Sequence, residues 1–200
     1  TEGRRLAPLM AARRAAGRVR EGHGDLHLGN LLWLEGRARL FDAIEFDPAL
    51  RWIDVACDIA FVFMDLHAHG LAALAWRFLN AWLEHSGDFG AVARLPYDAV
   101  YRALVRAKVA ALRAGGGGAP PAAEAEARRY VQLAAQLAAP RRPWLALTVG
   151  VSGSGKSSQT QTLIERRALV RLRADVERKR LFGLAPQAAS AGVPGGIYRE

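Results

Sequence analysis

A glycine-rich loop at residues 150–157 constrains the fold of this 200-residue chain more than any other feature. Its sequence, GVSGSGKS, fits the pattern G-x-x-x-x-G-K-[ST] at every fixed position. Glycines let backbone N–H groups curl around a phosphate because no Cβ stands in the way. An apolar run at residues 144–149 precedes the loop, and a helical pattern begins at about Lys156. The sequence therefore predicts a strand, a phosphate loop and a helix, the opening of an α/β domain.

The residues of this loop have distinct expected roles in binding a nucleoside triphosphate. Lys156 is expected to reach the β- and γ-phosphates, and Ser157 to hold Mg²⁺ through its hydroxyl. The N-terminus of the next helix adds its dipole and its unpaired amide donors. The predicted cofactors are therefore ATP and Mg²⁺. The predicted nucleotide-binding residues are Gly150, Val151, Ser152, Gly153, Ser154, Gly155, Lys156, Ser157 and Ser158.

A second candidate site lies at residues 23–30, with the sequence HGDLHLGN. Asp25 and Asn30 have the spacing of a kinase catalytic loop, in which an aspartate accepts the proton of the substrate hydroxyl. Asn30 and Asp42 flank a hairpin predicted at residues 31–35 and 38–41, each six residues from Gly36. Opposite positions on a hairpin lie ~5 Å apart, so the two side chains are predicted to share Mg²⁺ unless the register slips by one residue. A chance match of the short H-G-D run is the alternative.

The remaining pattern is mainly helical. The residues for which helices are predicted are 6–20, 52–67, 71–85, 97–114 and 122–139. Glycine and proline at residues 115–121 break this pattern, and prolines at residues 140–143 end it before the phosphate loop.

Two further stretches extend these motifs into a family resemblance. Residues 22–61, GHGDLHLGNLLWLEGRARLFDAIEFDPALRWIDVACDIAF, are followed by YRALVRAKVAALR and then by the phosphate loop. This order resembles bacterial proteins described as bifunctional aminoglycoside phosphotransferase-like and ATP-binding. Its first part is similar to the aminoglycoside phosphotransferase/choline kinase-like fold. The resemblance implies that Asp25 is the catalytic base, that Asn30 and Asp42 bind metal, and that Asp58 accepts bonds from the catalytic-loop backbone. Solvated surface positions for Asp54 and Asp58 are the alternative.

The chain beyond the phosphate loop resembles P-loop kinases of the gluconate-kinase and polynucleotide-kinase-like type. The segment that carries this resemblance is RADVERKR at residues 173–180. It implies that Asp175, at the end of a second strand, orients or deprotonates the acceptor hydroxyl, with Arg173 or Arg178 near phosphate. The alternative is that Asp175 caps a helix at residues 176–182.

These motifs imply two incomplete domains. Residues 1–139 are expected to form a mostly helical, α+β kinase-like C-lobe with a β-hairpin, and its upstream lobe is missing. Residues 140–143 are a linker, and residues 144–200 begin a P-loop kinase domain with a parallel α/β sheet. The expected activity is ATP-dependent phosphorylation of a hydroxyl on a small molecule. The alternative is a nucleotide-binding regulatory module whose kinase-like lobe is inactive.

The charge and the cysteine content bear on two questions, namely whether the protein binds nucleic acid and where in the cell it lies. The formal net charge is +9, and Lys108, Lys156 and Lys179 are the only lysines, so arginine supplies most of the positive charge. No basic run is interleaved with aromatic residues as a groove for single-stranded nucleic acid would require, so nucleic acid is not an expected partner. Cys57 is the only cysteine, and no apolar stretch approaches the ~20 residues that span a bilayer. The protein is expected to be cytoplasmic.

Overall fold

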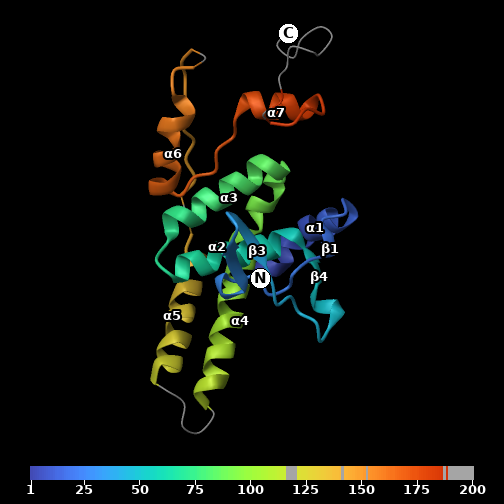
Figure 1. The fold of residues 1–200 in the computed structure, drawn as a ribbon, viewed down its shortest axis with the longest axis vertical. Helices are drawn as coiled ribbons and strands as arrows, with labels where there is room; N and C mark the ends of the chain where they lie inside the picture. Colours follow the sequence, from blue (N-terminus) through green and yellow to red (C-terminus); the bar gives the residue numbers. More distant parts are fainter. Residues whose placement is uncertain (116–120, 141, 152, 187, 189–200) are drawn as a thin grey trace. The chain divides into compact units, whose positions relative to one another are not determined.

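The computed structural model describes residues 1–115, 121–140, 142–151, 153–186 and 188. These residues form seven α-helices, three short 3-10 helices and two antiparallel sheets of two strands each (Figure 1). The chain divides into two compact units. The first contains Thr1–Ala75 and Gly90–Ala146, and the second contains Trp76–Phe89 and Leu147–Glu200. None of the helices formed by the described residues is long and apolar enough to cross a membrane.

The first unit contains most of the regular structure. β1 pairs with β4, and β2 pairs with β3. Its elements are α1 (Glu2–Ala15), β1 (Val19–Glu21), η1 (Leu28–Asn30), β2 (Leu31–Leu34), β3 (Arg37–Leu40), η2 (Pro48–Leu50), β4 (Trp52–Asp54), α2 (Val55–Ala68), the start of α3 (Ala72–Ser86), most of η3 (Phe89–Ala93), α4 (Leu95–Gly115) and α5 (Pro121–Ala138).

The core of the first unit forms where α4 packs against both α2 and α5 (Figure 1). Small residues at helical spacing line one face of α4, so that its neighbours can approach closely. Large apolar side chains from α2 and α5 fill the space, and their burial supplies most of the hydrophobic stabilisation. The buried residues of this core include Ala99, Ala103, Ala107 and Ala110 of α4, Phe61, Phe63 and Met64 of α2, and Tyr130 of α5.

A buried ion cluster joins α1, the start of α2 and the start of α4. Asp54 caps α2 by accepting the amide of Ala56 at 2.9 Å. Arg13 donates to both carboxylate oxygens of Asp54, at 2.7 and 2.8 Å. Arg94 donates to Asp54 at 2.6 Å and also forms a two-bond contact with Asp98. Buried charges are tolerated only when they are paired in this way.

These partners also set the ionisation of Asp54. Burial alone would raise its pKa, but the hydrogen bonds from Arg13 and Ala56 and the charge of Arg94 outweigh burial. The pKa of Asp54 therefore lies below its usual value of 3.8. A lowered folded-state pKa means that the contribution to stability is complete above pH 3.8 and is lost as the pH falls through the folded-state value.

The second unit contains α6 (Lys156–Arg167), α7 (Ala174–Leu181) and the C-terminal part of α3. The unit boundary lies within α3, so a helix from the middle of the chain joins the region that follows the glycine-rich loop. Among the described residues of this unit, the buried apolar side chains are Trp76, Leu79, Leu83, Ile164 and Val176.

Several elements agree with the sequence prediction. The hairpin is confirmed, as are the helices predicted at 71–85, 97–114, 122–139 and from Lys156, each within a few residues. The first unit ends at Ala146, and residues 76–89 belong to the second unit. The identification of residues 1–139 and 144–200 with two kinase domains stays a prediction.

Three elements differ from the prediction. The helix predicted at 6–20 ends at Ala15, because Gly17 adopts a φ of 67° that stops the helix. Residues 52–54 form β4, because they pair with β1 before Asp54 caps α2. The strand predicted at 144–149 does not form, since the described residues offer it no neighbouring strand, and Leu145, Leu147 and Val149 are each more than 80% exposed. The predicted parallel sheet is therefore wrong for the part of the chain that the structure describes.

The ion cluster leads to a stability prediction. Asp54→Ala should lower the free energy of unfolding by ~3–5 kcal/mol, because it leaves Arg13 and Arg94 buried without their shared partner. Urea unfolding at neutral pH measures the change, with the exposed Glu35→Ala as control. The difference between wild type and Asp54→Ala should shrink as the pH falls below 3.8. An unchanged unfolding midpoint at neutral pH would contradict the role of the cluster.

Candidate functional site

Two residues of the glycine-rich loop adopt left-handed backbone conformations that favour glycine. Gly153 and Gly155 both have a φ of 79°, and Gly155 occupies the position before the first residue of α6. A side chain at either position would be strained, because L-residues rarely adopt this region. Ser152, one of the predicted nucleotide-binding residues, lies outside the described residues.

Lys156 folds back over this loop. Its Nζ donates to the main-chain oxygens of Gly150 and Val151, both at 2.6 Å, and lies 3.3 Å from Oγ of Ser154. An ammonium has three N–H donors, so loop oxygens occupy all of them. A bound phosphate must therefore replace one or more of these contacts, and the flexible four-carbon side chain permits that exchange.

The start of α6 fits an anionic ligand. The first four amides of an α-helix have no partner within the helix, and its dipole favours negative charge at this end. Gly150 precedes the turn with a φ of 150°, and a Cβ there would lie 3.1 Å from Oγ of Ser154. Ser157 and Ser158 are exposed in the first turn. The free amides, the lysine and the exposed hydroxyls are groups that fit an anionic phosphate ligand.

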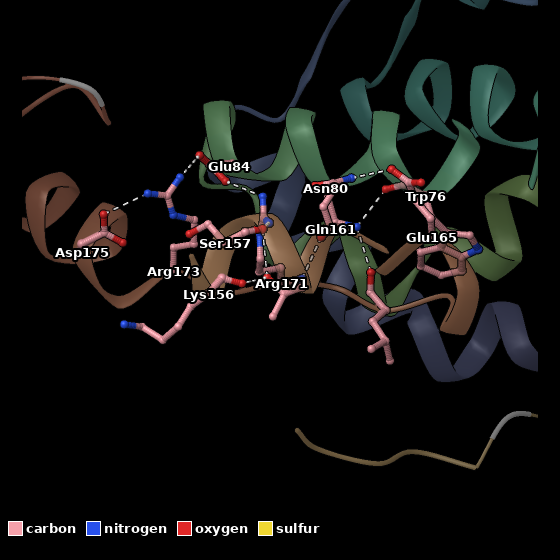
Figure 2. A network of polar contacts seen from close by, with 12 residues as sticks. Trp76, Asn80, Glu84, Lys156, Ser157, Gln161, Glu165, Arg171, Arg173 and Asp175 are labelled. Atoms are coloured by element: carbon pink, nitrogen blue, oxygen red, sulfur yellow. Dashed lines mark hydrogen bonds and ion pairs between the residues drawn. The ribbon is translucent and has the colours of Figure 1, made fainter. Parts of the chain in front are cut away.

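Residues after α6 form a polar network around the C-terminal part of α3 (Figure 2). Arg173 pairs with Glu84 at 3.1 Å and with Asp175 at 3.0 Å. α7 begins at Ala174 with Arg173 in the N-cap position, so the alternative that Asp175 caps this helix is wrong. The residues before α7 belong to no helix or strand, although Arg173 itself has an extended backbone. The role of Asp175 toward an acceptor hydroxyl stays a prediction.

In the first unit, the loop at residues 23–30 is anchored by Asp58. The two carboxylate oxygens of Asp58 accept the amides of His23 and Gly24, at 2.8 and 3.0 Å. The anchor that the family resemblance implied for Asp58 is therefore confirmed. The alternative of solvated surface acids is wrong for both Asp54 and Asp58, since both are buried.

Asn30 and Asp42 lie close together, although the hairpin register differs from the prediction. The turn falls at Glu35 and Gly36, both with positive φ, and Leu31 pairs with Leu40. In continuation of this register Asn30 faces Phe41, because the two-residue turn starts one residue earlier than predicted. The Asn30 amide nevertheless donates to the main-chain oxygen of Asp42 at 3.4 Å.

The same amide group of Asn30 donates to the main-chain oxygen of Asp25 at 2.9 Å. Asn30 thus joins the predicted base and the predicted metal ligand Asp42 through main-chain atoms. Among the described residues, no group of three or more His, Cys, Asp or Glu side chains is arranged to hold a metal. Metal binding by Asn30 and Asp42 stays a prediction.

Asp25 is ionised readily in this setting. Its carboxylate is 40% exposed and lies 3.6 Å from Nε2 of His27. Contact with His27 lowers the pKa of Asp25 most strongly, burial opposes it, and the charges of Arg106 and Arg102 lower it further. A carboxylate that stays charged at neutral pH can accept a hydrogen bond from a substrate hydroxyl.

Sequence reasoning missed three residues that organise these loops. Asp65 accepts the amide of Leu28 at 2.9 Å and the hydroxyl of Tyr130 at 3.0 Å. A signal was present, because Asp65 lies two helical turns after Asp58 and shares its face. Asn80 and Glu84 of α3 contact residues 169–173, and no local pattern in the sequence marks them.

Comparison with known proteins supports one of these sites. Residues 145–195 match the family model of an AAA domain, which indicates nucleotide binding through a P-loop. The uncharacterized proteins Rv2004c of Mycobacterium tuberculosis (strain H37Rv) and Mb2027c of Mycobacterium bovis are both 33% identical to this chain over 191 residues. The alignment covers 95% of this chain and 38% of each relative, so the chain spans less than half of their length. No solved structure gives a significant match.

The anchor of the loop at residues 23–30 can be tested through Gly22. A Cβ at this position would lie 2.5 Å from Oδ2 of Asp58, so Gly22→Ala should displace the carboxylate. Losing the acceptor of two amides should lower the free energy of unfolding by ~1–3 kcal/mol and speed amide exchange at His23 and Gly24. Gly115→Ala is the control, because no atom lies within 4 Å of its Cβ. Equal exchange rates in wild type and Gly22→Ala would contradict the anchor.

Proposed function

We propose that this chain is part of an ATP-dependent phosphotransferase that modifies a hydroxyl of a small molecule. The observation that carries the proposal is the glycine-rich loop, over which Lys156, the first residue of α6, folds back. The AAA-domain match over residues 145–195 supports nucleotide binding at this loop. The choice of ATP, of Mg²⁺ and of phosphoryl transfer is part of the proposal.

Each residue of the loop has one task in this proposal. Lys156 binds the β- and γ-phosphates, and amides at the start of α6 bind oxygens of the same groups. Ser157 contributes its hydroxyl to Mg²⁺. Bound ATP supplies the phosphoryl group. Asp175 orients the acceptor hydroxyl or accepts its proton, and its ion pair with Arg173 fixes the direction of its carboxylate.

A second phosphotransfer site is proposed at residues 23–42. Asp25 serves as the base, and Asn30 and Asp42 serve as oxygen ligands for Mg²⁺. Three observations support it. Asp58 anchors the loop, the Asn30 amide bonds to the main-chain oxygens of Asp25 and Asp42, and the pKa of Asp25 is lowered. The relatives are longer than this chain, and the residues that would cover the ATP phosphates at this site are proposed to lie in such additional sequence.

A regulatory nucleotide-binding module is the second candidate function. In that case only the P-loop binds nucleotide, and residues 23–42 form an inactive scaffold. The observation that favours it is the use of the Asn30 amide in two hydrogen bonds to main-chain oxygens, which is a structural task. Turnover with candidate hydroxyl acceptors separates the two functions.

Lys156→Ala tests nucleotide binding directly. The charge that this lysine places on the phosphates cannot be supplied by backbone donors alone, so ATP binding should fall below detection. Isothermal titration calorimetry with Mg²⁺ measures the affinity. Lys108→Ala is the matched control, because Lys108 is an exposed lysine of α4, and it should bind ATP like wild type. Equal affinities for Lys156→Ala and wild type would reject the site.

Asp25→Ala tests whether the first unit is catalytic. In the full-length protein it should reduce one phosphotransfer rate by ~10²–10⁴-fold, because a positioned base is lost. ATP affinity at the P-loop should stay unchanged, since Lys156 and Ser157 are intact. A radiolabelled phosphoryl-transfer assay, run beside calorimetry, measures both quantities. If every turnover survives Asp25→Ala, the regulatory candidate replaces catalysis by this unit.

A further inference from the structure

The C-terminal part of α3 belongs to the same compact unit as the glycine-rich loop. It lies far upstream of residues 145–195, which match the AAA domain. Two polar side chains of this helix, Asn80 and Glu84, point at the segment of residues 169–173 (Figure 2). They are four residues apart and therefore share one face of the helix.

Asn80 bonds to this segment as a neighbouring strand would. Its Nδ2 donates to the main-chain oxygen of Leu169 at 2.8 Å, and its Oδ1 accepts the amide of Arg171 at 2.7 Å. One residue of a parallel strand bonds in the same way to the residues before and after its opposite partner. A further bond from Nδ2 to the oxygen of Trp76, at 2.8 Å, fixes the amide on α3. Asn80 is buried, so these bonds are shielded from water.

Glu84 holds the side chains of the same segment. Its carboxylate lies 3.1 Å from the guanidinium of Arg173 and 3.5 Å from that of Arg171. The exposed fraction of the Glu84 side chain is 29%, so the contacts are partly screened. Two arginines on one carboxylate nevertheless fix the directions of both guanidinium groups.

Each arginine then reaches a residue of the proposed nucleotide site. Nη1 of Arg171 donates to the main-chain oxygen of Ser157 at 3.0 Å. Nη2 of Arg173 donates to Oδ2 of Asp175 at 3.0 Å. Ser157 is the proposed Mg²⁺ ligand, and Asp175 is the residue proposed to face the acceptor. Glu84 is therefore linked to both groups, through one arginine each.

We propose that Asn80 and Glu84 of α3 are positioning residues of the nucleotide site, which act through Arg171 on Ser157 and through Arg173 on Asp175. This inference rests on the proposed function of the loop. Asn80 fixes the backbone of residues 169–171, and Glu84 fixes the side chains that reach the site. The nucleotide site then requires a helix from outside the region that matches the AAA domain.

Glu84→Gln in the full chain tests this link. The neutral side chain pairs weakly with Arg171, so the bond from Arg171 to the main-chain oxygen of Ser157 is weakened, and with it the hold on the first turn of α6 that carries the proposed Mg²⁺ ligand. Residues that orient metal ligands typically change metal affinity or activity by about 10–100-fold, and we expect a loss in this range for ATP with Mg²⁺. ATP affinity measured in EDTA should change by less than about twofold, because Lys156 and the α6 amides still bind phosphate. Calorimetry with and without Mg²⁺ gives both values.

Two further variants separate positioning from folding. Glu124→Gln removes an exposed carboxylate from α5 and should match wild type with and without Mg²⁺. Arg171→Lys keeps the charge beside Glu84 but cannot bridge to Ser157 in the same fork, so it should reproduce the Mg²⁺-specific loss. If Glu84→Gln does not fold by circular dichroism, Arg171→Lys decides the result.

The outcomes distinguish this inference from the proposed function. If wild type binds ATP and both variants bind it equally well with Mg²⁺, the positioning role is wrong and the proposed function stands. If the variants lose affinity equally in EDTA and in Mg²⁺, α3 has only a structural role, which also overturns the inference. If wild type itself does not bind ATP, the proposed function fails and this inference fails with it.

Discussion

Three buried carboxylates, one at the N-cap of α2 and two within this helix, organise the first unit, because a buried charge must find partners. Each carboxylate takes its partners from segments distant in sequence. Asp54 binds Arg13 and Arg94, Asp58 binds the amides of His23 and Gly24, and Asp65 binds the amide of Leu28 and the hydroxyl of Tyr130. The loop that carries Asp25 is consequently held at both ends by carboxylates of one helix, and bonds from Asn30 and Ile44 add to this anchor.

In the second unit, a neutral and a charged side chain of α3 together supply the partners of the segment at residues 169–173. A segment that leaves a phosphate loop normally gains its backbone partners from a parallel sheet. Here the described residues supply no such sheet, and an asparagine of α3 bonds to the segment instead. Glu84 pairs with Arg171 and Arg173 of this segment. Arg171 then bonds to the first turn of α6, and Arg173 bonds to the first turn of α7.

Local patterns in the sequence were sufficient for some of these features. The glycine-rich loop, the helix after it and the hairpin follow from short-range signals, and the role of Asp58 followed from the family resemblance. The hairpin register was predicted wrongly because the sequence allows the turn to begin at Glu35 or at Gly36. The structure shows positive φ at both Glu35 and Gly36, so the turn begins at Glu35. The strand at residues 144–149 was predicted wrongly, because strand formation requires a partner strand and a local apolar pattern cannot show whether one is present. Asn80 and Glu84 act on residues about ninety positions away, as the separation of 89 between Asn80 and Leu169 shows, so no local pattern could identify them.

The contact of Asn80 with Leu169 and Arg171 also constrains the order in which the chain can fold. α3 leaves the ribosome long before residue 169, so the second unit cannot be completed while α4 and α5 are being made. Closing a loop of 89 residues costs conformational entropy that grows only slowly with length, but such non-local contacts form late. Until they form, the buried amide of Asn80 and the apolar side chains beside it stay exposed to other proteins. The second unit is thus completed only after α4 and α5 have been made, and the C-terminal part of α3 stays open to chaperones and proteases until then.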